Sequence, residues 1–178
     1  MPEQKGMAKS VMIALFGAVI AVCSFIYIPT GAVPVTLQLF AVCVSAGVLG
    51  RAGAVSVLVY LLLGIIGLPV FSGFQAGVSA LAGPTGGFLL GFLPLAFVSG
   101  LIIEKTGRRL ANYLIAFSVG TVICYASGLV MYMYLYCGGN AGLIEAFTVC
   151  ILPYIIPDAV KIVLAAIVTR ALRERVKI

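Results

Sequence analysis

Charge is scarce in this sequence. Of its 178 residues, 9% are charged and 63% are hydrophobic. A soluble domain of this size would need many more polar groups to cover its surface. Long stretches carry no charge at all, and they lie between Lys9 and Arg51, between Arg51 and Glu104, and between Arg109 and Glu145. Each stretch can hold one or two membrane-spanning helices of about 20 residues, so the sequence predicts a polytopic α-helical membrane protein.

Histidine is also absent. Without it the chain has no Ser-His or Cys-His pair for nucleophilic catalysis, and its five carboxylates are scattered. The P-loop motif G-x-x-x-x-G-K-[ST] is missing, and the glycine-rich residues 83–87 (GPTGG) carry no lysine. We therefore expect neither an enzyme nor an ATPase. The acid and base described below do not form the ring of like charges that selects ions in a channel.

Metal clusters, disulfides and nucleic-acid binding are not expected either. The five cysteines, at positions 23, 43, 124, 137 and 150, include no C-x-x-C pair. Small apolar side chains packed between helices are their expected role. The net charge of +6 does not indicate a nucleic-acid surface, because the cations lie at the ends of the apolar runs, where they set membrane topology.

The apolar runs predict six transmembrane helices in one all-α membrane domain that covers residues 1–178. The predicted spans are 8–27, 38–50, 52–66, 86–104, 110–136 and 157–173. Residues 143–152 (LIEAFTVCIL) predict a short extra helix before the last span. Because the runs are continuous rather than alternating, a membrane β-barrel is not expected. The first run lacks a small-residue cleavage site, so we expect a transmembrane helix there and not a removed signal peptide.

The cations predict the orientation of these spans. If both termini are cytoplasmic, ten lysines and arginines lie inside and the outer loops carry none. This asymmetry follows the positive-inside rule. The ten are Lys5, Lys9, Arg51, Lys105, Arg108, Arg109, Arg170, Arg173, Arg175 and Lys177. We therefore expect both termini in the cytoplasm and a lipid bilayer around the spans.

One acid and one base, Asp158 and Lys161, lie within the apolar segment LPYIIPDAVKIVLAAIV. Ionisable residues in membrane helices are costly and usually face a partner or a cavity. Their i,i+3 spacing places both on one helix face, and Pro157 places Asp158 in a first turn, where the helix dipole favours a carboxylate. We interpret the pair as the floor of an outward-facing site for a polar small molecule. An internal salt bridge without a ligand is the alternative.

Two predicted outer loops, residues 28–38 (IPTGAVPVTLQ) and 67–87 (GLPVFSGFQAGVSALAGPTGG), are rich in glycine and proline but uncharged. Irregular backbone at this depth must be buried in protein or line a cavity, and long ordered loops often cover binding sites. We expect lids over the site, with packing for stability alone as the alternative. The candidate polar groups are the side chains of Thr36, Gln38 and Gln75 and the backbone N–H groups of Gly83, Gly86 and Gly87.

Small residues recur every four positions in the first span, at Ser10, Ala14 and Ala18. Such a stripe lets another helix approach closely, so it predicts a docking face for a membrane partner. Packing inside the protein's own bundle is the alternative, because the same spacing occurs at Gly87 and Gly91 and again within the fifth span.

The segments VPVTLQLFAVCVSAGVLGR (33–51), YLLLGIIGLPVF (60–71), LAGPTGGFLLGF (81–92) and IPDAVKIVLA (156–165) together resemble the BioY family, in order and spacing over essentially the whole chain. BioY proteins are the biotin-binding S components of energy-coupling factor (ECF) transporters. The resemblance implies a six-helix protein of the prokaryotic cell membrane that binds biotin from outside. It also implies a transmembrane coupling protein and a pair of cytoplasmic ATPases as partners.

The family's acid and lysine on the last helix correspond to Asp158 and Lys161. Its small-residue docking motif matches Ala14 and Ala18, and its polar position after the third helix corresponds to Gln75.

Biotin chemistry agrees with these residues. Asp158 can accept from the ureido N–H groups, and Lys161 can donate to the ureido carbonyl or to the valerate carboxylate. Apolar walls are expected from Leu37, Phe71, Phe74, Tyr125 and Tyr154. No cofactor is implied. Three alternatives stay open: an S component for another vitamin, a structural membrane protein without a ligand and, more remotely, an intramembrane enzyme.

Overall fold

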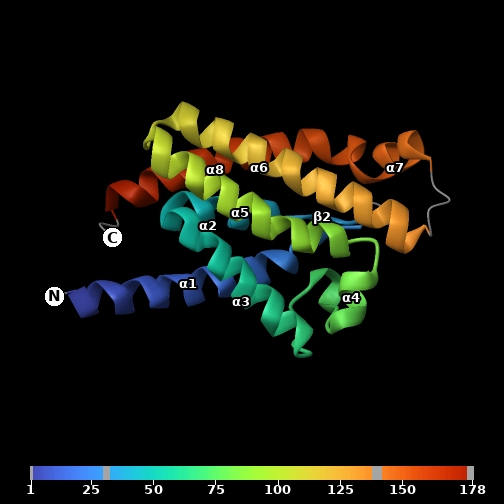
Figure 1. The fold of residues 1–178 in the computed structure, drawn as a ribbon, viewed down its shortest axis with the longest axis horizontal. Helices are drawn as coiled ribbons and strands as arrows, with labels where there is room; N and C mark the ends of the chain where they lie inside the picture. The colour runs from blue at the N-terminus through green and yellow to red at the C-terminus, as the bar shows by residue number, and fades with distance from the viewer. Residues whose placement is uncertain (1, 30–32, 138–141, 176–178) are drawn as a thin grey trace.

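The structure, a computed structural model, describes residues 2–29, 33–137 and 142–175 (Figure 1). In this part of the chain, eight α-helices lie in a bundle with two very short strands. The helices are α1 (Pro2–Ser24), α2 (Gln38–Leu49), α3 (Gly53–Ile65), α4 (Val78–Ala82), α5 (Gly86–Thr106), α6 (Leu110–Met131), α7 (Leu143–Cys150) and α8 (Ile155–Arg175). The strands β1 (Tyr27–Ile28) and β2 (Val35–Thr36) pair antiparallel, with Tyr27 opposite Thr36.

Apolar stretches long enough to cross a membrane confirm the prediction of a helical membrane protein. Within the described residues there are five: Gly6–Ser24, Gln38–Ile65, Gly86–Thr106, Leu110–Tyr134 and Leu143–Glu174. The second stretch holds two helices, α2 and α3, separated by a 3₁₀ turn at Gly50–Ala52. The helices therefore follow the six predicted spans, with ends shifted by up to six residues. The largest shifts are at the start of α1 and at the end of α6, where a π-helical turn continues from Tyr132 to Tyr136.

Helices α2 and α3 form an antiparallel hairpin at the centre of the bundle. Gln38 at the start of α2 bonds Tyr60 near the end of α3, whereas Ser45 bonds Gly53 at the start of α3. The sequence of α2 is apolar on all sides, which is typical of a helix with no exposed face. Eleven of its twelve residues are buried, and it contacts α1, α3, α5 and α8. At about 1.5 Å per residue it spans about 18 Å, less than the hydrocarbon core of a bilayer.

Close contacts between α5 and α6 depend on small residues. Gly87 packs against the backbone of α6 at Ser127, and Gly91 packs against Cys124. Gly120 on α6 lies against Leu95 of α5. Residues without bulky side chains let the two backbones approach closely. The stripes of small residues in these two helices therefore serve packing inside the bundle.

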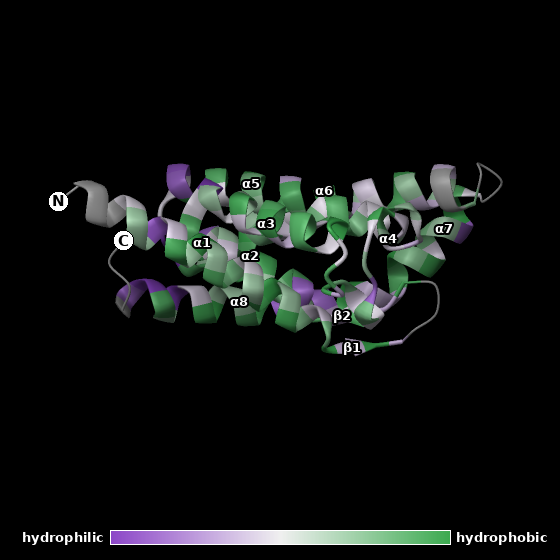
Figure 2. Ribbon diagram, turned by 90° about the horizontal axis from the view of Figure 1, so that it is seen from below, coloured by the Kyte–Doolittle hydropathy of each residue, from purple (hydrophilic) through white to green (hydrophobic). Residues whose placement is uncertain are grey.

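Both chain ends lie at the same end of the bundle (Figure 1). Hydrophilic residues gather at that end, with a second group near β2 (Figure 2). An ion pair at the terminal end joins Arg51, in the α2–α3 turn, to Glu104 of α5 at 2.6 Å, and the backbone N–H of Arg51 also donates to Glu104. This arrangement agrees with an even number of spans, and the cytoplasmic location of this end stays a prediction of the positive-inside rule.

The two predicted lids contain regular elements that the sequence did not predict. The connection after α1 contains the β1–β2 pair. The connection after α3 contains a 3₁₀ turn at Ser72–Phe74 and the short helix α4. Neither element was predicted, because strands of two residues and a helix of five are too short to leave a periodic pattern.

We predict that Gly100 tolerates no side chain. It lies where α5 crosses the turn between α2 and α3, and an added Cβ would overlap backbone atoms of Gly50 and Arg51. Overpacking against such a rigid neighbour typically costs about 1–3 kcal/mol. Gly100→Ala should therefore lower the unfolding temperature of the detergent-solubilised protein. Gly6→Ala is the matched control, because a Cβ there meets no atom within 4 Å; equal unfolding temperatures for the two variants would contradict this account.

Candidate ligand-binding site

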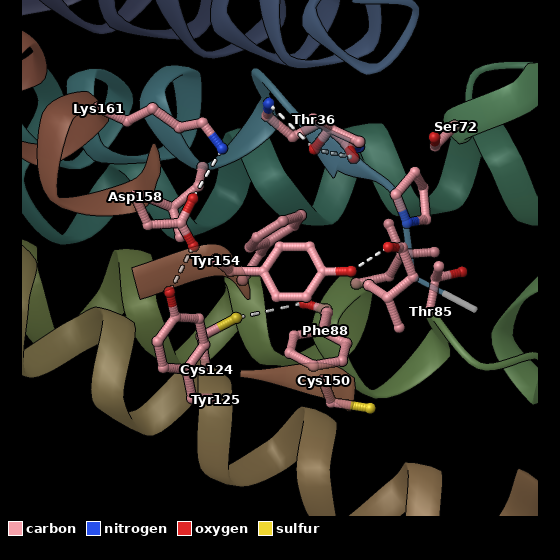
Figure 3. A pocket seen from close by; sticks show the side chains of 16 residues that line it. Thr36, Ser72, Thr85, Phe88, Cys124, Tyr125, Cys150, Tyr154, Asp158 and Lys161 are labelled. Atoms are coloured by element: carbon pink, nitrogen blue, oxygen red, sulfur yellow. Dashed lines mark hydrogen bonds and ion pairs between the residues drawn. The ribbon is translucent and has the colours of Figure 1, made fainter. Parts of the chain in front are cut away.

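A cavity lies between the helices, near the end of the bundle that holds β2, opposite the termini (Figure 1), and Figure 3 shows the side chains that line it. It is bounded by β2 and the chain before it, the first turn of α2, the 3₁₀ turn after α3, the residue before α5, the end of α7 with the turn that follows it, and parts of α5, α6 and α8. Its lining residues are Val33, Pro34, Thr36, Gln38, Leu39, Ser72, Thr85, Phe88, Leu89, Phe92, Cys124, Tyr125, Cys150, Tyr154, Asp158 and Lys161. The cavity therefore draws on segments from more than half of the sequence.

A hydrogen-bonded ion pair forms one wall of the cavity. The Lys161 ammonium donates to one carboxylate oxygen of Asp158 at 2.7 Å, and the Tyr125 hydroxyl donates to the other at 2.6 Å. Asp158 is only 6% exposed and Lys161 only 9%. Asp158 lies in the first turn of α8, where the helix dipole also favours its negative charge. Figure 3 shows the carboxylate between the two donors.

The charges of this pair are incompletely used. A lysine ammonium carries three N–H donors, and among the described residues Lys161 has Asp158 as its one hydrogen-bond partner. Each oxygen of Asp158 can accept further bonds. A buried charge pair is stable only when its remaining polar groups are satisfied, so the free donors and acceptors favour a polar guest in the cavity.

A second polar group faces the cavity from β2 and α2. The Thr36 hydroxyl donates to the Gln38 side-chain oxygen at 3.0 Å, and the Gln38 amide nitrogen donates to the Tyr60 hydroxyl at 2.5 Å. Gln38 is buried and Tyr60 has no exposed surface. These bonds fix the amide orientation of Gln38, so Thr36 and Gln38 present a preorganised polar edge.

The remaining walls are apolar or aromatic. Phe88, Leu89 and Phe92 come from α5, where their spacing places them on one helix face. The ring of Tyr154 crosses the cavity in Figure 3, and its hydroxyl donates to the backbone carbonyl of Val33. This bond ties the start of α8 to the loop before β2. The cavity thus combines a charged end, a polar edge and apolar walls, which is the usual composition of a small-molecule site.

Five of the predicted site residues line this one cavity. They are Thr36, Gln38, Tyr154, Asp158 and Lys161. Tyr125, predicted as a wall, also lines it and in addition bonds Asp158. Their contact with a ligand stays a prediction.

Three other predicted site residues lie elsewhere in this structure. Gln75 and Gly83 line a separate depression on the loop before α5, outside the cavity. Phe74 is 64% exposed and stacks on Phe25 at a centroid distance of 4.8 Å. The reason is the path of the loop. Phe71 is buried and its N–H bonds the Gln75 carbonyl, so the chain between them folds outward as a tight loop.

The other expected contributors from the loops also turn away from the cavity. Phe71 packs edge-to-face on Tyr60, and Leu37 packs against the core. The N–H of Gly86 already donates to the Gly83 carbonyl, and Gly87 is occupied by its contact with α6.

Several lining residues were not foreseen. Thr85 is the residue of the glycine-rich segment 83–87 that lines the cavity, whereas backbone N–H groups of its glycines were expected there. Ser72 lies in the loop after α3. The bond between Tyr125 and Asp158 joins α6 to α8 through two residues that lie 33 positions apart in the sequence. A hydroxyl in the middle of an apolar span was the available signal, since a buried tyrosine usually has a polar partner.

The small-residue stripe of α1 is accessible. Ser10, Ala14 and Ala18 are exposed, whereas Phe16 and Ile20 on the opposite face are buried. The bundle does not use this stripe for its own packing, unlike those of α5 and α6. Its role in docking stays a prediction.

The loop after α3 is attached to the end of α1 at two points. The Ser24 hydroxyl lies 2.6 Å from the Val70 carbonyl, and the Phe25 ring stacks on Phe74. These two contacts therefore hold the end of α1 against the loop that contributes Ser72 to the cavity lining.

Fold and cavity together define a polytopic helical membrane protein with an internal pocket for a small polar molecule. The model of the BioY family matches residues 1–178, and the chain belongs to the BioY family.

Relatives and a solved structure agree with this assignment. The biotin transporter BioY of Thermotoga maritima is 41% identical over 170 residues, which cover 94% of this chain and 97% of the relative. The probable biotin transporter BioY of Pyrococcus horikoshii is 38% identical over 168 residues, covering 93% and 97%. The fold is similar to the crystal structure of the S-component for biotin from an ECF-type ABC transporter, with a TM-score of 0.89 and 27% identity over 98% of this chain and 95% of that chain. The predicted fold class is confirmed, and the chain is a prokaryotic multi-pass membrane protein.

We predict that the Asp158–Lys161 pair couples strongly in stability. Asp158→Asn leaves a buried ammonium without its counter-charge, and Lys161→Met leaves a buried carboxylate; breaking such a pair typically costs about 3–5 kcal/mol. The double variant removes both charges, so it should be less destabilised than the sum of the two single variants. Thermal unfolding of the four ligand-free proteins in detergent measures this coupling, and strictly additive losses would show that the two charges do not depend on one another.

Proposed function

We propose that this chain is the membrane-embedded substrate-capture component of an ECF-type ABC transporter and that it binds biotin for uptake. The observation that carries the proposal is the buried pair Asp158–Lys161, which keeps unused donors and acceptors on the wall of an otherwise largely apolar cavity. The names of the relatives and of the matching crystal structure supply the ligand. The proposal assigns this chain no catalytic step and no cofactor.

The cavity chemistry suits the two ends of biotin. The ureido ring has two N–H donors and a carbonyl acceptor, and the valerate chain ends in a carboxylate. Asp158 supplies the acceptor for ureido N–H groups, and Lys161 supplies donors for the carbonyl or the carboxylate. The apolar thiophane ring and alkyl chain match walls such as Phe88 and Phe92. Thr36 and Gln38 add a neutral polar edge whose orientation is set before the ligand arrives.

Access is proposed from the outer side of the membrane. The cavity lies at the end of the bundle opposite the termini (Figure 1), and the positive-inside rule assigns the terminal end to the cytoplasm. The segment with β1 and β2 contributes lining residues directly, and the loop after α3 contributes Ser72. Both segments are thus placed to cover a bound molecule.

This sequence has no ATP-binding P-loop, so any ATP hydrolysis that drives uptake would come from another protein. We propose a transmembrane coupling protein and a pair of cytoplasmic ATPases, as the ECF class implies. The exposed stripe Ser10, Ala14 and Ala18 on α1 is the proposed contact with the coupling protein, because small residues permit close helix packing in a membrane.

Biotin should bind the purified, detergent-solubilised chain, and both Asp158→Asn and Lys161→Ala should weaken binding at least tenfold. The physical reason is the loss of a charged hydrogen bond, worth roughly 1.5–3 kcal/mol. Isothermal titration calorimetry with biotin, thiamine and riboflavin tests both the site and its selectivity.

Glu104→Gln is the matched control for this titration. It makes the same carboxylate-to-amide change in an ion pair at the other end of the bundle, so biotin affinity should stay at the wild-type value. Unchanged affinity in both pocket variants would refute the site, and binding of another vitamin in place of biotin would refute the ligand.

A bulky residue on the α1 stripe should separate capture from assembly. Ala14→Trp places a large side chain on an exposed small position, so co-purification with a coupling protein should fall while biotin affinity is retained. Leu15→Trp is the control, since Leu15 is exposed and already bulky. Equal recovery of the complex with both variants would mean that the stripe is not the docking face.

A further inference from the structure

A second hollow lies at the terminal end of the bundle, far from the cavity described above. It is bounded by the connection between α5 and α6, the first turn of α6 and the last turns of α8. Four arginines line it: Arg108, Arg109, Arg170 and Arg173. Neither the pair Asp158–Lys161 nor any other residue of the biotin site contributes to it.

The positive charge in this hollow is poorly neutralised. Glu174 is the one acid among its lining residues, and it pairs with Arg170 at 3.6 Å. Arg173 donates to the backbone carbonyl of Gly47 and takes part in none of the ion pairs found among the described residues. Arg108 and Arg173 come from different elements and line the same hollow, so their like charges repel each other. A bound anion would relieve this repulsion.

A buried hydroxyl in the same hollow has no partner. Tyr113 has no exposed surface, and its hydroxyl makes no hydrogen bond among the described residues. It lines the hollow and interacts electrostatically with Arg108 and Arg173. An unsatisfied buried hydroxyl costs about 1–3 kcal/mol, so a native structure normally provides a partner.

The N-terminus of α6 adds to this field. Helix α6 begins at Leu110, and its N-cap residue Arg109 supplies no side-chain cap. The first N–H groups of a helix lack intrahelical acceptors and carry partial positive charge. Four guanidinium groups, a hydroxyl and an uncapped helix end therefore converge, a combination that suits a phosphate group.

We propose that this hollow binds the phosphate headgroup of an anionic phospholipid. A lipid is favoured over free phosphate because an exposed apolar surface begins beside the hollow: Ile167 on α8, one turn before Arg170 and on the same helix face, is 51% exposed. From Arg170, Ile167 lies toward the middle of α8, which is the direction in which the acyl chains of a bound lipid would extend. Basic pockets between helices on the cytoplasmic side are typical sites for anionic lipid headgroups.

The test is lipid binding by the purified, delipidated chain. Short-chain phosphatidylglycerol, phosphatidylcholine and inorganic phosphate are titrated separately, with thermal unfolding and native mass spectrometry as readouts. Phosphatidylglycerol should raise the unfolding temperature saturably and remain bound at about one molecule per chain. Phosphatidylcholine and inorganic phosphate should do neither.

Variants distinguish a built site from general surface charge. Arg108→Gln with Arg170→Gln should weaken phosphatidylglycerol binding at least fivefold, because it removes two lining cations. Tyr113→Phe keeps the ring and should weaken binding about two- to fivefold. The double control Lys9→Gln with Lys105→Gln removes two exposed cations outside the hollow and should bind like wild type.

Three results would overturn the proposal. Equal weakening by the lysine control would show diffuse attraction, and equal stabilisation by inorganic phosphate would identify a free anion as the occupant. Retention of wild-type binding by both the arginine and the Tyr113 variants would place any lipid elsewhere. Circular dichroism and gel filtration show whether each variant is folded. Because this check does not use biotin, the lipid test can be read whether or not the chain binds biotin.

Discussion

A carboxylate and an ammonium buried next to each other impose the strictest requirement on this bundle. Removing two charges from water is costly, and their attraction offsets that cost only when further hydrogen bonds satisfy them. Tyr125 provides one such bond from α6, and the first turn of α8 provides a favourable dipole for Asp158. Lys161 carries further N–H donors beyond the one it gives to Asp158, and we propose that a ligand accepts from them. A ligand that accepts from these donors would stabilise the folded protein as it binds, which couples stability to binding.

The central hairpin of α2 and α3 explains how a polar edge is kept rigid in an apolar bundle. Because α2 is surrounded by four other helices, it can begin deep in the protein with Gln38, whose amide is held by Tyr60. Because α2 is short, the space beyond its N-terminal end is free for the extended chain around β2. Thr36 and Gln38 reach the cavity from this short helix and strand, where a full-length span would have filled the space.

The helices could be predicted because charge-free apolar runs leave few alternatives to spans in a bilayer. The pair Asp158–Lys161 could be predicted because charge inside such a run is costly. The loop residues were harder. Phe74 was chosen as an aromatic wall, Gln75 by its polarity and its match to the family, and Gly83 for its backbone N–H. The bond between Phe71 and Gln75 turns residues 71–75 outward, and Gly83 lines the same separate depression as Gln75. Tertiary contacts between distant segments, such as Tyr125 with Asp158, leave no local pattern in the chain.

The attachment of the α1 end to the loop after α3 has a mechanical consequence. Ser24 bonds the Val70 carbonyl and Phe25 stacks on Phe74, so the end of the helix and the loop are joined at two points. A tilt of α1 within the membrane must carry the loop along or break both contacts. A displacement of the end of α1 would therefore reach, through these two contacts, the loop that contributes Ser72 to the lining of the cavity.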